Sequence, residues 1–281
     1  MTSQGDFFHS VVPDDAVPEH DFDTSVAHPA RIWNVFLGGK DNFAADRAAA
    51  EGVLAASPVV AEVARADRAF LASAVSYLVA EAGIRQFLDI GTGLPTANNT
   101  HEVAQRAAPE SRIVYVDNDP IVLAHARALL TSDPRGVTAY IDADVRDTGR
   151  ILAQAAETLD FSQPVAVLLL GILPFIPDAD EPHVLTSRLM AAVAPGSYLA
   201  ISHGASDIQV VSVTEANRRY NERSAVALNL RTRAAVARMF GNLELIPPGV
   251  VPLDYWRPGQ PAPAEGGLPA YGALARKPPR G

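Results

Sequence analysis

A glycine-rich turn directly after a strand-like run is the first stretch of this chain that could bind a ligand. The apolar part of "FLDIGTGLPT" ends at Asp89, and Gly91, Gly93 and Pro95 follow. Such a turn at the end of a parallel strand lets the backbone approach a ligand closely. A dinucleotide site requires a third glycine, which is missing here, and a carboxylate at Asp89 would repel pyrophosphate. The turn therefore favours a cationic ligand, with a plain tight turn as the alternative.

An acid also ends the next strand-like run. "RIVYVD" finishes at Asp117, and Asn118 and Asp119 follow before a proline that suits a helix start. In nucleotide-binding folds an acid at this point accepts hydrogen bonds from both ribose hydroxyls, in NAD and S-adenosylmethionine sites alike. We therefore expect Asp117, with its neighbour Asn118, to face a nucleoside, and Asp119 to cap the following helix.

A third acidic turn follows "GVTAYID". Asp144 could accept a hydrogen bond from an adenine amino group while Val145 packs on the ring and offers its backbone N–H. Asp142 is an alternative for the acidic role, and Asp147 is expected to cap a helix. A solvated acidic loop is the remaining interpretation of this stretch.

The elements that must position these residues alternate regularly. Strand-like runs at 85–90, 112–117, 136–142, 164–172 and 196–203 are separated by helical stretches at 98–108, 120–131, 149–158 and 181–193. This alternation predicts an α/β fold with a doubly wound, mostly parallel, seven-stranded Rossmann-like sheet. Further helices are expected at 207–223 and 232–240, one short strand within 242–253, and a last strand near an edge within 270–278.

The N-terminal part differs in composition from the alternating part. Residues 1–27 have no sustained period and are predicted to form a flexible arm, whereas 28–83 are rich in alanine and helical in pattern. We expect 28–83 to form a helical cap or lid and 84–281 to form the ligand-binding domain.

The composition argues against several classes of protein. The chain has 281 residues, a net charge of −9, and no cysteine. The acidic balance argues against nucleic acid as a partner, and the missing cysteines exclude disulfides and thiolate chemistry. There is no signal peptide pattern and no apolar run of about 18 residues, so we expect a cytoplasmic protein without a membrane span. No histidine and acid spacing typical of a metal site is present.

Several stretches together resemble a known family. The pattern Asp-x-Gly-x-Gly at Asp89 is similar to the first motif of class I S-adenosylmethionine-dependent methyltransferases. The chain resembles an actinobacterial family of these enzymes, long catalogued as a domain of unknown function, over nearly everything after residue 28. The resemblance rests on "RIWNVFLGGKDNFAADR", "FLDIGTGLPTANNTHEVAQ", "IVYVDNDP", "LLLGILPFIPD", "WRP" and "ARKP". Relatives commonly carry a histidine where this chain has Pro174.

The resemblance implies S-adenosylmethionine as the cofactor, with the glycine turn beside its methionine part. It also implies a lid, in which Arg31 or Lys40 would pair with the methionine carboxylate and Asn42 would bond to polar atoms. A salt-bridged helix pair is the alternative for this segment. The complete set of cofactor-binding candidates is Asp89, Gly91, Thr92, Gly93, Asp117, Asn118, Asp144, Val145, Gly171, Arg31, Gly39, Lys40 and Asn42.

Catalysis is less defined by the sequence. Methyl transfer is an in-line displacement that requires a general base only for a hydroxyl or a protonated amine. The candidates for that base are His203 and His101. We expect a methyltransferase acting on a small-molecule acceptor, with a homodimer left open. A non-catalytic S-adenosylmethionine-binding regulatory protein and an NAD-dependent oxidoreductase are the alternatives.

Overall fold

The structure is a computed structural model that describes residues 23–129, 132–261 and 266–279. Most of the predicted N-terminal arm, residues 1–22, and the end of the helix predicted at 120–131 lie outside the described residues.

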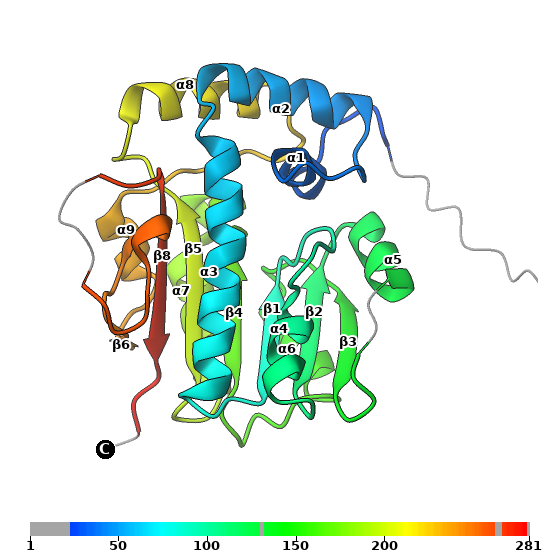
Figure 1. The fold of residues 1–281 in the computed structure, drawn as a ribbon, viewed down its shortest axis with the longest axis vertical. Coiled ribbons are helices and arrows are strands. Elements are labelled where there is room, and N and C mark those ends of the chain that lie inside the picture. Colours follow the sequence, from blue (N-terminus) through cyan, green and yellow to red (C-terminus); the bar gives the residue numbers. More distant parts are fainter. Residues whose placement is uncertain (1–22, 130–131, 262–265, 280–281) are drawn as a thin grey trace, which may run out of the picture.

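A mostly parallel sheet forms the centre of the molecule (Figure 1). Among the described residues it has eight strands, in the order β3-β2-β1-β4-β5-β8-β6, with β7 paired to β8. The first five strands are parallel and β8 is antiparallel to β5. The predicted fold class is confirmed; one strand more than predicted is present because the stretch before β8 supplies two very short strands. The strands are β1 (Gln86–Ile90), β2 (Arg112–Asp117), β3 (Val137–Asp142), β4 (Ala166–Leu170), β5 (Tyr198–Gly204), β6 (Glu244–Leu245), β7 (Val251–Pro252) and β8 (Ala270–Arg276).

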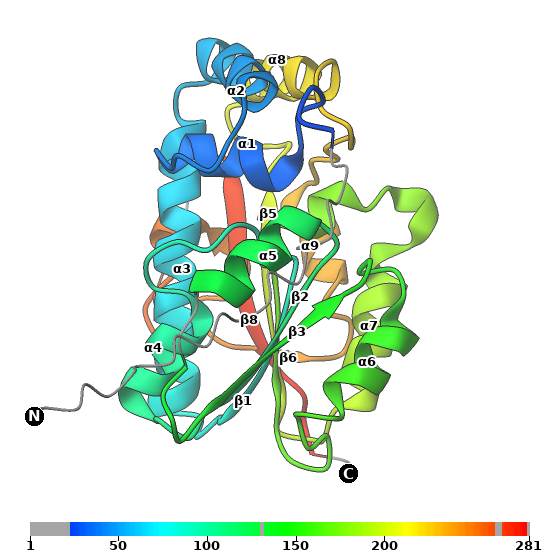
Figure 2. The same ribbon diagram turned by 90° about the vertical axis from the view of Figure 1, so that its right-hand side faces the viewer.

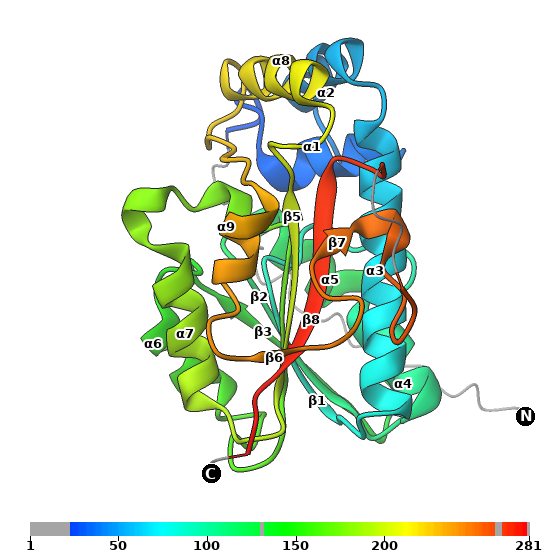
Figure 3. The ribbon, with the colours of Figure 1, turned by 90° about the vertical axis from the view of Figure 1, so that its left-hand side faces the viewer.

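Helices cover both faces of the sheet (Figures 2 and 3). One apolar core lies between the sheet and α3 and α4, and a second lies between the sheet and α6, α7 and α9. The central strand β4 serves both, because Leu168 faces the first core and Val167 and Leu169 face the second. The helices are α3 (Val60–Ala80), α4 (Thr100–Ala107), α5 (Pro120–Leu129), α6 (Thr148–Ala155), α7 (Pro182–Ala192) and α9 (Arg233–Arg238).

Three further helices lie across the carboxyl ends of the parallel strands (Figure 1). We call α1 (Pro29–Phe36), α2 (Ala44–Ala56) and α8 (Val210–Asn221) the cap layer. They share an apolar cluster, and a backbone bridge joins Ala27 to Ser224. Within the segment 28–83 predicted as a cap, α1 and α2 lie in the cap layer, whereas α3 packs on the sheet. The third helix of the cap layer, α8, comes from a later part of the chain.

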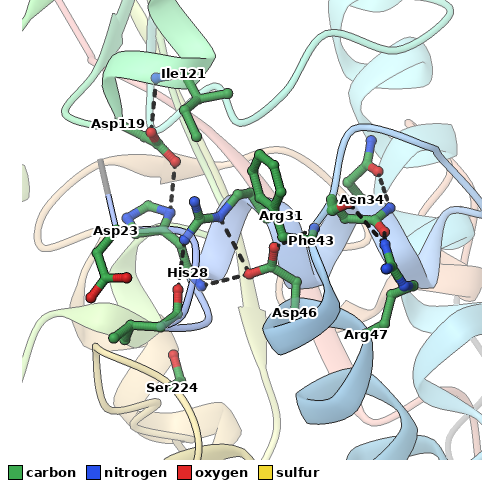
Figure 4. Close-up of polar contacts among 12 residues, drawn as sticks. Asp23, His28, Arg31, Asn34, Phe43, Asp46, Arg47, Asp119, Ile121 and Ser224 are labelled. Carbon is green, nitrogen blue, oxygen red and sulfur yellow. Dashed lines mark hydrogen bonds and ion pairs between the residues drawn. The ribbon is translucent and has the colours of Figure 1, made fainter. Parts of the chain in front are cut away.

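A buried carboxylate fixes the start of the cap layer (Figure 4). Asp46 is fully buried and accepts hydrogen bonds from the backbone N–H groups of His28, at 3.0 Å, and Phe43, at 2.8 Å. The Arg31 Nε lies 3.3 Å from the same carboxylate. One side chain therefore ties the entry of α1 to the first turn of α2, and its charge is compensated by a buried guanidinium.

We expect Asp46→Ala to lower the free energy of unfolding by about 2–4 kcal/mol, because it leaves the Arg31 charge buried without its partner. Urea denaturation followed by circular dichroism measures this. The matched control is Asp41→Ala, whose side chain is 47% exposed. Equal stability of the two variants would show that Asp46 does not hold the cap layer.

Candidate cofactor-binding cavity

A cavity of about 290 Å³ lies between the carboxyl edge of the sheet and the cap layer. Its floor comes from the turns after β1, β2, β3 and β4, and its roof comes from α1 and α8. α3 forms one wall. The cavity therefore lies at the edge where parallel α/β sheets bind their ligands.

The glycine turn after β1 has a backbone that favours glycine. Gly91 and Gly93 have φ angles of 76° and 63°, and Gly171 after β4 has 70°. A Cβ on Gly91 would lie 2.6 Å from the Ile172 Cβ, so packing alone excludes a side chain there. A Cβ on Gly93 or Gly171 would meet no heavy atom within 4 Å. These two positions, with Thr92, line open space that a ligand could fill.

Asp117 is buried at the end of β2 and holds the glycine turn. Its Oδ2 accepts a hydrogen bond from the Gly93 N–H at 2.9 Å, and its Oδ1 accepts from the Asp119 N–H at 3.0 Å. Burial raises the pKa of this carboxyl above its usual range. Asp119 caps α5 by accepting from the Ile121 N–H at 2.9 Å, as predicted. Asp117 and Asn118 both line the cavity.

The structure distinguishes the two acids near the end of β3. Asp144 and Val145 line the cavity, whereas Asp142 is exposed and is not among the lining residues. The Asp144 carboxylate lies 2.6 Å from Arg146 Nη2, and that hydrogen bond lowers the pKa of Asp144. Asp147 caps α6 through the Arg150 N–H, as predicted.

Asp89, just before the glycine turn, is a buried acid with a raised pKa. It is 5% exposed, and its Oδ2 accepts a hydrogen bond from the Thr100 hydroxyl at 2.6 Å. Burial raises the pKa of Asp89 to about 6, although Thr100 and the Arg68 charge oppose the rise. A buried acid of this kind is stabilised by any ligand that brings positive charge or a donor.

The cap residues predicted to touch the cofactor lie elsewhere. Arg31 donates to the Val26 carbonyl at 2.7 Å and pairs with Asp46, and it does not line the cavity. Lys40 is exposed. Asn42 donates to the Gly39 carbonyl at 3.0 Å and stabilises the turn between α1 and α2. A side chain at Gly39 would overlap Asn34, which explains the glycine there by packing.

The two candidate bases occupy different environments. His101 is buried, its ring Nδ1 lies 2.8 Å from the Tyr115 hydroxyl, and it does not line the cavity. His203 does line the cavity. Its Nε2 lies 2.9 Å from Arg231 Nη1, and its Nδ1 lies 2.9 Å from the Gly204 carbonyl. Since the guanidinium only donates, Nε2 accepts, and burial lowers the pKa of His203 to about 4. Both ring nitrogens are therefore engaged in the neutral side chain.

Arg231 also fixes the loop after β4. It donates to the carbonyls of Leu173, at 3.0 Å, and Ile176, at 2.6 Å, and its Nη2 lies 2.7 Å from Asp178. Pro174 lines the cavity in this same loop. His203 and Arg231 together thus position one wall of the cavity.

Among the lining residues that the sequence did not single out are two neighbours on α3. Asp67 and Arg68 of α3 both line the cavity, and Asp67 is 7% exposed. The sequence did hold a signal, because Asp67 lies four residues from both Val63 and Leu71, two apolar residues of the predicted helical stretch, and therefore on the same helix face. A carboxylate in the middle of a buried stripe is typical of a functional position.

The parallel sheet, the glycine turn and the successive acids at its strand ends fit the class I methyltransferase fold. The model of the S-adenosyl methyltransferase family matches residues 15–278, and the chain belongs to this family. Its cofactor is S-adenosylmethionine.

Two solved structures are similar to the chain over nearly its full length. A DUF574 family protein from Streptomyces avermitilis is 44% identical, with a TM-score of 0.86, over 91% of this chain and 99% of the other. A protein from Thermobifida fusca, named for a proposed methyltransferase activity, is 39% identical, with a TM-score of 0.83, over 93% and 99%. Among curated proteins, none matches. Within the described ranges no helix has the length and apolar character that crossing a membrane requires.

The Asp89 environment predicts a pH effect on stability. Its folded pKa of about 6 exceeds the ordinary value of 3.8, so the folded state binds more protons between these values, and stability falls as pH rises through them. Relative to Asp89→Asn, which keeps the Thr100 contact, the cofactor-free wild type should lose roughly 2–3 kcal/mol between about pH 4 and pH 7.

Urea denaturation of both proteins at the two pH values measures that difference. Asp142→Asn, at an exposed position of the same sheet edge, is the control. A wild-type minus Asp89→Asn difference that is independent of pH would contradict the proposed environment of Asp89.

Proposed function

We propose that this chain transfers a methyl group from S-adenosylmethionine to a small-molecule acceptor held in the cavity under the cap layer. The observation that carries the proposal is the shared cavity, which the strand-end residues of a methyltransferase fold and an apolar roof line together. S-adenosylmethionine, when bound, supplies a methyl group attached to a positively charged sulfur. The sulfur is the leaving group and becomes a neutral thioether. The chain's own residues orient, desolvate and enclose the reactants.

The strand-end residues fit the nucleoside part of the cofactor. Asp117 would accept hydrogen bonds from the ribose hydroxyls, because each of its oxygens has a second lone pair beside the backbone bond it already accepts. Asp144 would accept from the adenine amino group while Val145 packs on the ring. Asn118 and Gly171 also line the cavity.

Arg68 fits the carboxylate of the methionine part. Its Nη2 donates to the carbonyls of Ala97 and Asn98, at 3.2 and 2.9 Å, so it lies beside the glycine turn. Its buried Nε has no hydrogen-bond partner among the described residues, and its charge acts on Asp89. A guanidinium offers the paired donors that a carboxylate accepts, which Arg31, held by Asp46, cannot do from its position.

The cap layer would exclude water from the reacting groups. His28, at the start of α1, lines the cavity, and its Nδ1 lies 2.9 Å from the Asp119 carboxylate. This contact ties the cap layer to the turn that carries Asp117. A cytoplasmic location and the absence of a nucleic-acid partner stay predictions from the sequence.

A labelling experiment tests the function. Protein and methyl-labelled S-adenosylmethionine are incubated with the small-metabolite, protein and RNA fractions of a cell extract. We expect label in the small-metabolite fraction, and none with Gly91→Val, whose side chain would collide with Ile172. Label in protein or RNA would contradict the acceptor class. Cofactor binding without any transfer would favour the non-catalytic, regulatory alternative.

The role of Arg68 is tested with two ligands that share the nucleoside. Arg68→Met should weaken S-adenosylhomocysteine about tenfold or more, while methylthioadenosine, which lacks the amino-acid end, should change by less than about twofold. Isothermal titration calorimetry measures both. Arg65→Met, at an exposed position of the same helix, is the matched control. An equal loss for both ligands would place Arg68 in the support of the turn instead.

A further inference from the structure

The cavity extends beyond the residues that fit the cofactor. Its far end, the α8 end, is lined by Asp67 of α3, Phe175 after β4, Ser202 of β5, and Asn217 and Tyr220 of α8. The Phe175 and Tyr220 ring centroids lie 6.3 Å apart, and Ala64, one turn from Asp67, belongs to the same apolar cluster as Tyr220.

Two polar atoms at the α8 end have no hydrogen-bond partner among the described residues, Asp67 Oδ1 and Asn217 Oδ1. The Tyr220 hydroxyl beside them interacts with Ser224. Asp67 and Tyr220 are 7% and 4% exposed. A buried polar atom without a partner is destabilising by about 1–3 kcal/mol, so atoms of this kind that line a cavity indicate a ligand that satisfies them.

Asp67 lies apart from the cofactor contacts although it is next to Arg68 in the sequence. Arg68 reaches the 97–98 loop beside β1, whereas a hydrogen bond joins the Asp67 carboxyl to Ser202 on β5. β4 lies between those two strands, which separates them by about 10 Å. The carboxyl at the α8 end is thus placed for a second ligand beside the cofactor.

The chemistry of the α8 end defines what that ligand carries. A carboxylate and an amide oxygen only accept hydrogen bonds, so the ligand must donate. Phe175, Val213 and Leu228 give the same space apolar walls, which suit an apolar body. A carboxylate ligand is disfavoured because it would be desolvated beside Asp67.

We propose that Asp67 binds the nucleophilic amine or hydroxyl of an apolar methyl acceptor and takes its proton, an inference that rests on the proposed function. The lone pair of the nucleophile forms the bond to the methyl carbon, the electron pair of the carbon–sulfur bond stays on sulfur, and the N–H or O–H proton passes to an Asp67 oxygen. Burial raises the pKa of Asp67, against the opposing effects of Ser202 and Arg68, which suits a group that accepts a proton. This role falls to Asp67 because both nitrogens of His203 are engaged.

The test uses protein saturated with S-adenosylhomocysteine, so that binding is measured without turnover. Benzylamine, benzyl alcohol and benzoate serve as probes that share one ring, and nuclear magnetic resonance titration gives their affinities. The wild type should bind the amine or the alcohol about tenfold or more tightly than benzoate, and the better of the two identifies the donor. Asp67→Asn should abolish that preference while its S-adenosylhomocysteine affinity stays within about twofold of the wild type. Glu62→Gln, an exposed position on the same helix, should behave as the wild type.

Each other result overturns a specific statement. Benzoate binding as tightly as the amine and the alcohol, no binding of any probe, or a preference that survives in Asp67→Asn would overturn the proposal. A loss of S-adenosylhomocysteine affinity in Asp67→Asn would assign Asp67 to the cofactor instead. Failure of the wild type to bind S-adenosylhomocysteine would overturn the proposed function itself.

Discussion

Negative charge buried around one cavity is the constraint on which the rest of this structure depends. Asp67, Asp89 and Asp117 are each less than a tenth exposed, and burial raises the pKa of all three. A folded chain tolerates such groups only where donors compensate them. Thr100, the backbone N–H groups of the glycine turn and the charge of Arg68 supply part of that compensation. S-adenosylmethionine would supply further donors to Asp89 and Asp117, and the acceptor proposed above would supply one to Asp67.

A buried positive charge, that of Arg231, also lies beside the cavity and is compensated by acceptors. Arg231 is buried and donates hydrogen bonds to two carbonyls of the loop after β4, to Asp178 and to His203. The neutral histidine is the acceptor that lets a guanidinium lie there without a second carboxylate. The loop therefore has one fixed position, and the shape of the cavity wall that includes Pro174 follows from it. His203 therefore has a structural role. Its position at the end of a strand does not reveal that role by itself.

The sequence predicted those parts of the molecule that depend on local pattern. Alternating strand and helix signals predicted the sheet, and the end of each strand predicted where Asp89, Asp117 and Asp144 would lie, because parallel strands share their carboxyl edge. It could not predict pairings between elements distant in the chain. Asp46 compensates the charge of Arg31, and Arg31 does not line the cavity. Asp67 and Arg68 line it instead, because the face of α3 that carries them is turned toward the cavity. The packing of α8 against α2 has no signature in the hydrophobic pattern of either helix. The cap was therefore predicted from the N-terminal helices alone.

The cap layer also determines the order in which the cavity is completed. Arg219 and Arg223, at the end of α8, donate to the carbonyls of Gly52 and Ala48 of α2, contacts that span 167 and 175 residues of the chain. Contacts between such distant segments form late, since the loop between them must first be closed. As the chain emerges from the ribosome, α1 and α2 precede the whole parallel sheet, but their partner α8 is made only after β5. The roof over the strand ends and their carboxylates is therefore incomplete until α8 has been synthesised.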